Sequence, residues 1–182
     1  NMRWAYLLQG ILFVGIILIA VYAMQSKQTS TVPDIIETVE PTMTATLSIT
    51  SPVFEQNGRI PGKYTCDLPA QAGGNISPPL VFSGVPESAE SLALIMDDPD
   101  VPKALHPDGV FDHWVLFNIP PATSGISEGK SIGTAGVNGG GKNAYTGPCP
   151  PTQYEPSEHR YVFVLYALDT TLSLKEGATK QE

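Results

Sequence analysis

Short apolar runs alternate with glycine- and proline-rich turns along the chain from Thr46 onward. The runs are rich in valine, isoleucine, leucine, phenylalanine and tyrosine, and their lengths suit strands better than helices. The predicted strands cover residues 45–54, 63–66, 79–83, 91–97, 113–119 and 160–168, with a further candidate at 170–174. No helical pattern separates these runs, so we expect a mainly β fold, an antiparallel β-sandwich of Greek-key type.

Two of the runs, Leu92–Met96 and Tyr161–Leu168, are apolar at nearly every position. A strand with one face toward water would instead alternate apolar and polar side chains. We therefore expect both strands to occupy central positions in their sheets, covered on both faces.

The most apolar segment of the chain lies near its beginning, at Trp4–Met24. It carries no charged residue, and a helix of about 21 residues is about 31 Å long, enough to cross the apolar core of a bilayer. A helix buried in a soluble domain would show a polar stripe, which this segment lacks. We expect residues 1–24 to form a transmembrane anchor, because the run is longer than the apolar part of an ordinary signal peptide; a cleaved signal is the alternative.

Residues 25–46 are rich in threonine, serine, proline and glutamate, and we expect them to form a flexible linker to a folded domain at 47–182. Arg3 lies before the apolar segment and favours a cytoplasmic N-terminus, although Lys27 on the other side opposes this. The predicted location is a membrane-anchored protein with an extracytoplasmic domain. If the segment is cleaved, the domain is secreted or periplasmic.

The chain is acidic, with 18 acidic and 10 basic side chains and a formal net charge of −8. No basic run is longer than His159-Arg160, so the sequence offers no positive surface for a nucleic acid. Nucleic acid is therefore excluded as a partner.

The chain has two cysteines, Cys66 and Cys149, each close to a proline-rich turn. They are too few for a structural zinc site of the paired-cysteine kind, and no metal is expected. In an exported domain an even pair favours a disulfide, which here would close a loop of about 84 residues. Two buried free thiols are the alternative, and the sequence leaves both open.

Polar residues with useful chemistry gather at the ends of three predicted strands. Asp98 and Asp100 follow one strand, and His113 begins the next. His159 and Tyr161 lie at the start of the third. Histidine can donate hydrogen bonds to a phosphate or carboxylate, and an aspartate can fix the tautomer of a histidine. A single histidine in such a place is more often structural, but the group together favours a binding site.

Arg160 lies between two of these residues and should therefore face the other side of its strand. A structural ion pair with an acidic turn is the role we expect for it. The sequence also lacks an activated nucleophile: it has no G-x-S-x-G segment, and Cys149 has no base near it in sequence. We therefore expect a protein without catalytic residues.

Several segments in a fixed order carry a resemblance to a known family. They are a long segment at 64–94, DPDVP at 98–102, DHWVLFNIP at 112–120, YTGPCPP at 145–151 and HRYVFVLYALD at 159–169. Together they resemble the phosphatidylethanolamine-binding protein family, in its bacterial and archaeal, Raf kinase inhibitor-like branch. The resemblance covers roughly residues 47–180.

The resemblance implies a compact β-sandwich with a small anion-binding pocket and, in most members, no agreed catalytic activity. The ligand-pocket positions of the family are matched here by Asp98, Asp100, Pro102, His113, Pro151, His159 and Tyr161. Members of the family continue with a C-terminal helix beyond the position of Glu182. We expect that helix to be missing here, or the sequence to be a fragment.

The expected function is a non-catalytic ligand-binding module, without cofactor or metal, for a phosphate- or carboxylate-bearing ligand such as a phospholipid headgroup. A second expected contact is the membrane, through the N-terminal helix. The alternative is a regulatory inhibitor of a protease or kinase, acting through an exposed loop, for which 103–111 is the best candidate. An exported domain would meet a protease or another envelope protein rather than a cytosolic kinase.

Overall fold

The structure is a computed structural model that describes residues 46–67 and 74–182. The predicted anchor at 1–24 lies outside the described residues, as does the predicted linker at 25–46 apart from its last residue. Within the described ranges, no helix is long and apolar enough to cross a membrane.

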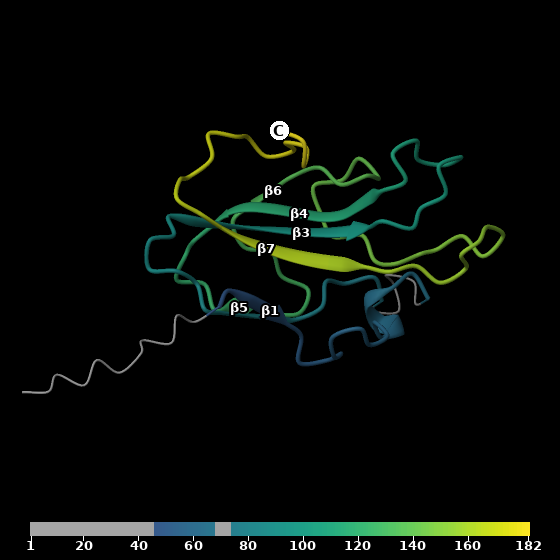
Figure 1. The fold of residues 1–182 in the computed structure, drawn as a ribbon, viewed down its shortest axis with the longest axis horizontal. Coiled ribbons are helices and arrows are strands. Elements are labelled where there is room, and N and C mark those ends of the chain that lie inside the picture. The colour runs from purple at the N-terminus through teal and green to yellow at the C-terminus, as the bar shows by residue number, and fades with distance from the viewer. Residues whose placement is uncertain (1–45, 68–73) are drawn as a thin grey trace, which may run out of the picture. The chain divides into compact units, whose positions relative to one another are not determined.

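Two antiparallel sheets form the fold, one above the other in Figure 1. In the smaller sheet the strand order is β1 (Ser48–Thr50), β2 (Leu80–Ser83) and β5 (Gly125–Ile126). In the larger sheet it is β6 (Thr134–Ala135), β4 (Phe111–Ile119), β3 (Ser91–Asp98) and β7 (Val162–Leu168). The only helix in the described ranges is the short 3-10 helix η1 (Gly62–Tyr64). The prediction of a mainly β fold is therefore confirmed.

The two sheets share one hydrophobic core. Its buried members come from both sheets: Leu80, Phe82, Leu92, Leu94, Met96, Trp114, Leu116, Ile119, Ile126 and Leu165. Along β3 every second side chain points into this core, and Leu92, Leu94 and Met96 are all fully buried. By the same alternation Asp98, the last residue of β3, also points inward, and its side chain is buried.

Three of the predicted strands are wrong in whole or in part. Residues 63–66 do not form a strand, because the carbonyls of Pro61 and Gly62 accept hydrogen bonds from the next turn and so produce η1. The predicted strand 45–54 pairs only over β1, and the chain bends at 52–54. The candidate at 170–174 forms no ladder, since Leu172 exchanges hydrogen bonds with the side chain of Asn118 instead.

β7 lies at the edge of its sheet, whereas its apolar sequence predicted a central position. Its inward side chains pack on the core, but Val162 and Tyr166 on the other face are 43% and 45% exposed. Apolar content alone therefore gave the wrong position for β7. The prediction is correct for β3, which pairs with strands on both sides.

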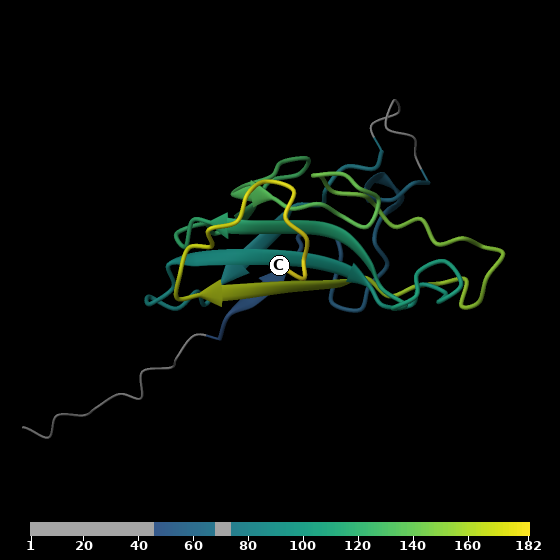
Figure 2. The ribbon, with the colours of Figure 1, turned by 90° about the horizontal axis from the view of Figure 1, so that it is seen from above.

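The C-terminal residues return across the outer face of the larger sheet (Figure 2). There the Nζ of Lys180 lies 3.0 Å from Asp97 on β3 and 2.5 Å from Asp112 on β4. These two carboxylates are direct cross-strand neighbours and would otherwise repel each other. Burial raises the pKa of Asp97 even though Lys180 lowers it, which shows the cost of burying a carboxylate there.

Candidate ligand-binding site

A β-bulge in β4 determines where His113 points. Met96 pairs with Trp114 and Asp97 with Asp112, so β4 holds one extra residue, His113, between the two pairs. Regular alternation would place neighbouring side chains on opposite faces. The bulge instead buries both, leaving Trp114 0% and His113 5% exposed.

The imidazole of His113 is held by the backbone of a distant loop. Its Nδ1 lies 2.6 Å from the carbonyl oxygen of Thr146, whose amide donates to the carbonyl of His113. Because a carbonyl only accepts, Nδ1 carries the proton, and Nε2 of the neutral ring carries a lone pair. Burial lowers the pKa of His113 below its ordinary value of 6.5, so the neutral ring predominates at pH 7.

His159 is fixed in the same tautomer by Asp98. Its Nδ1 lies 2.6 Å from Oδ2 of Asp98, and the two side chains are only 1% and 4% exposed. The other carboxylate oxygen of Asp98 accepts the backbone N–H of Asp100 over 2.9 Å. The Nδ1 proton of His159 is therefore directed at the carboxylate, and Nε2 is the atom left for other contacts.

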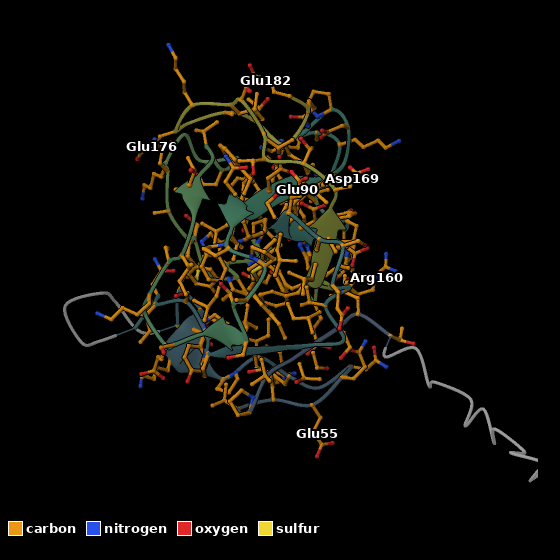
Figure 3. The ribbon with its side chains drawn as sticks, turned by 90° about the vertical axis from the view of Figure 1, so that its left-hand side faces the viewer. Glu55, Glu90, Arg160, Asp169, Glu176 and Glu182 are labelled. Atoms are coloured by element: carbon orange, nitrogen blue, oxygen red, sulfur yellow. A yellow bond between two sulfur atoms is a disulfide. The ribbon has the colours of Figure 1, made fainter. Side chains whose placement is uncertain are left out.

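Asp100 has a different partner. Its carboxylate accepts two hydrogen bonds from the guanidinium of Arg160, at 2.7 and 2.9 Å, and one from the backbone of the same residue. The hydrogen bonds from Arg160 lower the pKa of Asp100 to about 2. Arg160 is 74% exposed and lies on the outside of the molecule (Figure 3). The predicted ion pair of Arg160 with an acidic turn is confirmed, and it occupies the carboxylate of Asp100.

Tyr161 completes a cluster with the two histidines. Its ring packs edge-on against His113, with 5.2 Å between the ring centroids. Burial raises the pKa of Tyr161, and the charges of Asp98 and Asp100 raise it further, so the hydroxyl keeps its proton.

Two polar atoms of this cluster are buried without a well-formed hydrogen bond in the part of the chain that the structure describes: Nε2 of His159, and the hydroxyl oxygen of Tyr161, which lies near the Asp98 carboxylate but makes no bond of good geometry to it. A buried polar atom without a partner costs about 1–3 kcal/mol. These two atoms therefore mark a place where a polar group of a ligand would be stabilised.

The structure brings together Asp98, His113, His159 and Tyr161 of the seven predicted site residues. Pro102 and Pro151 are half-buried loop residues for which no direct contact with the cluster is evident. No group of His, Cys, Asp and Glu side chains that could hold a metal ion occurs within 46–67 and 74–182. A shallow hollow of about 380 Å³ lies at the opposite end of β7, away from the histidines; it is lined by Pro86, Ser88, Ala89, Ala167, Leu168 and Asp169.

Two residues that support His113 were not predicted from the sequence. Thr146 supplies the carbonyl that accepts its Nδ1 proton. Asn138, which is 4% exposed, donates from its amide group to the hydroxyl of Thr146 and to the carbonyl of Ala144. The only signal in the sequence was a single amide side chain among the glycines of GVNGGG.

Comparisons with known proteins agree with this fold. A family model described as phosphatidylethanolamine-binding protein matches residues 50–182. A UPF0098 protein from Methanothermobacter thermautotrophicus is 46% identical over 143 residues, which cover 75% of this chain and 85% of that protein. The chain belongs to the phosphatidylethanolamine-binding protein family.

Solved structures of other family members cover the same part of the chain. CT736 from Chlamydia trachomatis, described as a homolog of phosphatidylethanolamine-binding protein, has a TM-score of 0.67 and 43% identity over 75% of this chain and 84% of its own. E. coli YbcL, described as a member of the mammalian family, has a TM-score of 0.62 and 27% identity over 74% and 85%. A Mycobacterium tuberculosis relative, 37% identical over 73% of this chain and 61% of its own length, has a name that suggests a lipoprotein.

Proposed function

We propose that this phosphatidylethanolamine-binding protein-family domain binds a small ligand that carries a phosphate or carboxylate group, such as a phospholipid headgroup. The observation that carries the proposal is the pair of buried, unpartnered atoms on His159 and Tyr161, beside His113. A ligand oxygen that hydrogen-bonds to them removes the cost of leaving them unpaired. The hydrogen bonds of the two histidines to a backbone carbonyl and a carboxylate fix the orientation of both rings, as a preformed binding site requires.

The tautomers of the two histidines link binding to protonation. Both Nδ1 protons already face protein acceptors, Thr146 and Asp98. Nε2 of the neutral His113 ring can therefore donate to an anion only after that ring has taken up a second proton. Once charged, it donates a stronger hydrogen bond than a neutral ring does.

Affinity for glycerol 3-phosphate should rise as the pH falls from 8 to about 6, by at most about tenfold per pH unit for each proton taken up. Burial lowers the pKa of His113, although the charges of Asp98 and Asp112 act to raise it. The gain in affinity that comes from protonating His113 is therefore expected below pH 6.5. Below about pH 6 a phosphomonoester loses its second charge, and the affinity should level off and then fall.

A carboxylate such as acetate should continue to gain affinity to about pH 4, near the ordinary pKa of carboxylic acids. Calorimetric titration of both probes between pH 4.5 and 8 checks these profiles. Flat profiles for both probes would mean that the histidines are structural and that the proposed site is wrong.

We also propose that the full chain is attached to a membrane through Trp4–Met24. The proposal is supported by the uncharged, apolar sequence of that segment and by the relative whose name suggests a lipoprotein. Recovery of the full chain in the soluble fraction after cell disruption would reject it.

A regulatory role through the 103–111 loop is the second candidate. The observation in its favour is Leu105, a large apolar side chain that is 47% exposed on this loop. If the loop captures a protease, replacing 103–108 by glycine and serine should abolish capture and leave the binding of glycerol 3-phosphate unchanged. Surface plasmon resonance with a panel of envelope proteases measures capture. If the loop variant captures a protease as strongly as the wild-type chain, this role is rejected.

A further inference from the structure

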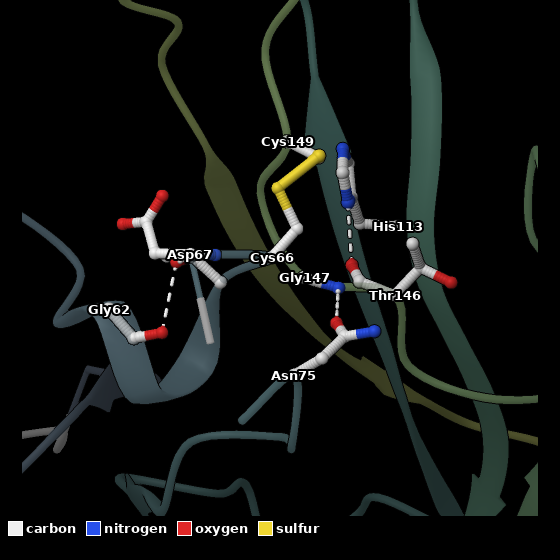
Figure 4. The surroundings of a disulfide bond; sticks show 9 residues. Gly62, Cys66, Asp67, Asn75, His113, Thr146, Gly147 and Cys149 are labelled. Carbon is white, nitrogen blue, oxygen red and sulfur yellow. Dashed lines mark hydrogen bonds between the residues drawn. A yellow bond between two sulfur atoms is a disulfide. The ribbon is translucent and has the colours of Figure 1, made fainter. Parts of the chain in front are cut away.

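The segment 145–151 supplies the carbonyl that holds His113, and a disulfide fixes this segment to a second one at 62–67 (Figure 4). Cys66 and Cys149 are 83 positions apart in sequence, and their Cα atoms are 5.4 Å apart. Only Gly147 and Pro148 separate Cys149 from Thr146. A movement of Cys149 is therefore passed to the Thr146 carbonyl over a very short stretch of backbone.

Hydrogen bonds join the same regions beside the disulfide. The amide of Cys66 donates to the carbonyl of Pro148 over 3.0 Å, and the hydroxyl of Tyr145 donates to the carbonyl of Tyr64 over 2.6 Å. The amide of Gly147 donates to the side chain of Asn75 over 2.7 Å. Each of these bonds replaces one to water and so adds little by itself. The disulfide is the covalent link that keeps them together.

The disulfide is also open to attack from solvent. Cys66 and Cys149 are both exposed residues, although Gly147 and Pro148 beside them are buried. Access is one of the factors that set the rate of thiol–disulfide exchange, and exposed disulfides are typical of labile and regulatory bonds.

We propose that the Cys66–Cys149 disulfide is a redox-modification site that controls the ligand site, and that a dithiol reductant opens it. The inference rests on the proposed function, because the property it regulates is ligand binding at His113. After opening, no covalent link joins segment 145–151 to segment 62–67, and only hydrogen bonds and the packing of Tyr145 against Trp114 hold it. The Thr146 carbonyl then no longer keeps the proton of His113 on Nδ1, and the ring is free to turn away from Tyr161.

The chemistry is thiol–disulfide exchange. A thiolate of the reductant attacks the sulfur of Cys66 or Cys149 and forms a mixed disulfide, while the other cysteine leaves as a thiolate and takes up a proton. The second thiol of the reductant then attacks the mixed disulfide and releases the remaining cysteine. The protein gains two electrons and two protons, and the dithiol becomes a disulfide.

The test compares the oxidised full chain with the same chain after reduction by dithiothreitol and blocking with iodoacetamide, using glycerol 3-phosphate as the probe. We expect the reduced form to bind about tenfold more weakly, within the usual range of coupling between two sites. The matched control is the Cys66→Ser/Cys149→Ser variant, which should bind as the reduced form does and not respond to dithiothreitol. Equal affinity of the oxidised and reduced forms, both folded by circular dichroism, overturns the inference.

Two additional measurements cover the cases in which the reduced chain unfolds or the oxidised chain does not bind the probe. If the reduced chain unfolds in plain buffer, the comparison is made in sucrose, which favours the folded state, and the same criterion applies. If the oxidised chain does not bind glycerol 3-phosphate, the proposed function fails instead. The inference is then judged by the ¹⁵N signal of His113 Nδ1, and a signal unchanged by reduction overturns it.

Discussion

Replacing His113 and His159 together by alanine should lower the affinity for glycerol 3-phosphate by at least about a hundredfold. A hydrogen bond to a charged group is worth about 1.5–3 kcal/mol, so two such bonds contribute about 3–6 kcal/mol, and 1.4 kcal/mol corresponds to a factor of ten. The effect is large because both rings are buried and held in place by their own partners, Thr146 and Asp98. Isothermal titration calorimetry at about pH 6, where binding should be strongest, measures the change.

The chain offers a matched control in His106, the third of its three histidines. Its side chain is 35% exposed, lies on the loop after Pro102 and approaches Asp108 at 3.9 Å. His106→Ala removes the same ring from a place outside the proposed site, and the affinity should stay unchanged. Full affinity in the double variant, with the fold intact by circular dichroism, would contradict the proposed function.

Replacing Cys66 and Cys149 together by serine should lower the free energy of unfolding by about 4.5 kcal/mol. The disulfide closes a loop of about 84 residues, and the chain-entropy model gives this value for the freedom that the unfolded chain gains when the link is lost. Such a loss is a large part of the stability of an ordinary domain. Urea unfolding followed by circular dichroism measures it.

The wild-type chain in dithiothreitol should unfold at the same urea midpoint as the serine variant, and the variant itself should not respond to the reductant. Agreement between the two would show that the loss comes from the cross-link rather than from the serine side chains. A urea midpoint unchanged by either treatment would mean that the disulfide contributes no stability.

The long strands of the larger sheet were predictable because their apolar runs are long enough to carry a pattern. β5 and β6 were not, because two residues, such as Gly125–Ile126, show no periodicity. They form only because neighbouring strands offer pairing partners, as Leu80 does for Ile126. The edge position of β7 could not be predicted either, since it depends on which strands find partners and not on the sequence of β7 itself.

The candidate site could likewise be predicted from the sequence only in part. Residue types at strand ends pointed to Asp98, His113 and His159, and the structure brings these three together. Which aspartate pairs with His159 was not predictable, because strand alternation would place Asp98 and Asp100, two residues apart, on the same face; the end of β3 at Asp98 separates them. The bulge that turns His113 inward has no sequence signal that we can identify.

Long-range partners account for the rest of what the sequence did not predict. Thr146 contacts His113 from a separate loop, and Lys180 reaches Asp97 and Asp112 from the end of the chain. No local sequence pattern predicts either contact. Both residues act on the site from outside it, by fixing the ring of His113 and the strand ends that carry it.

In the proposed site, Nε2 of His113 and Nε2 of His159 both hydrogen-bond to the anion of a ligand. The most direct measurement is a titration of the ¹⁵N-labelled histidine side chains with glycerol 3-phosphate, followed by NMR. We predict that both Nε2 signals move toward the protonated form as the ligand binds, that both Nδ1 atoms stay protonated, and that the signals of His106 do not change. Saturation of binding without any change in the Nε2 signals of His113 and His159 would contradict the claim.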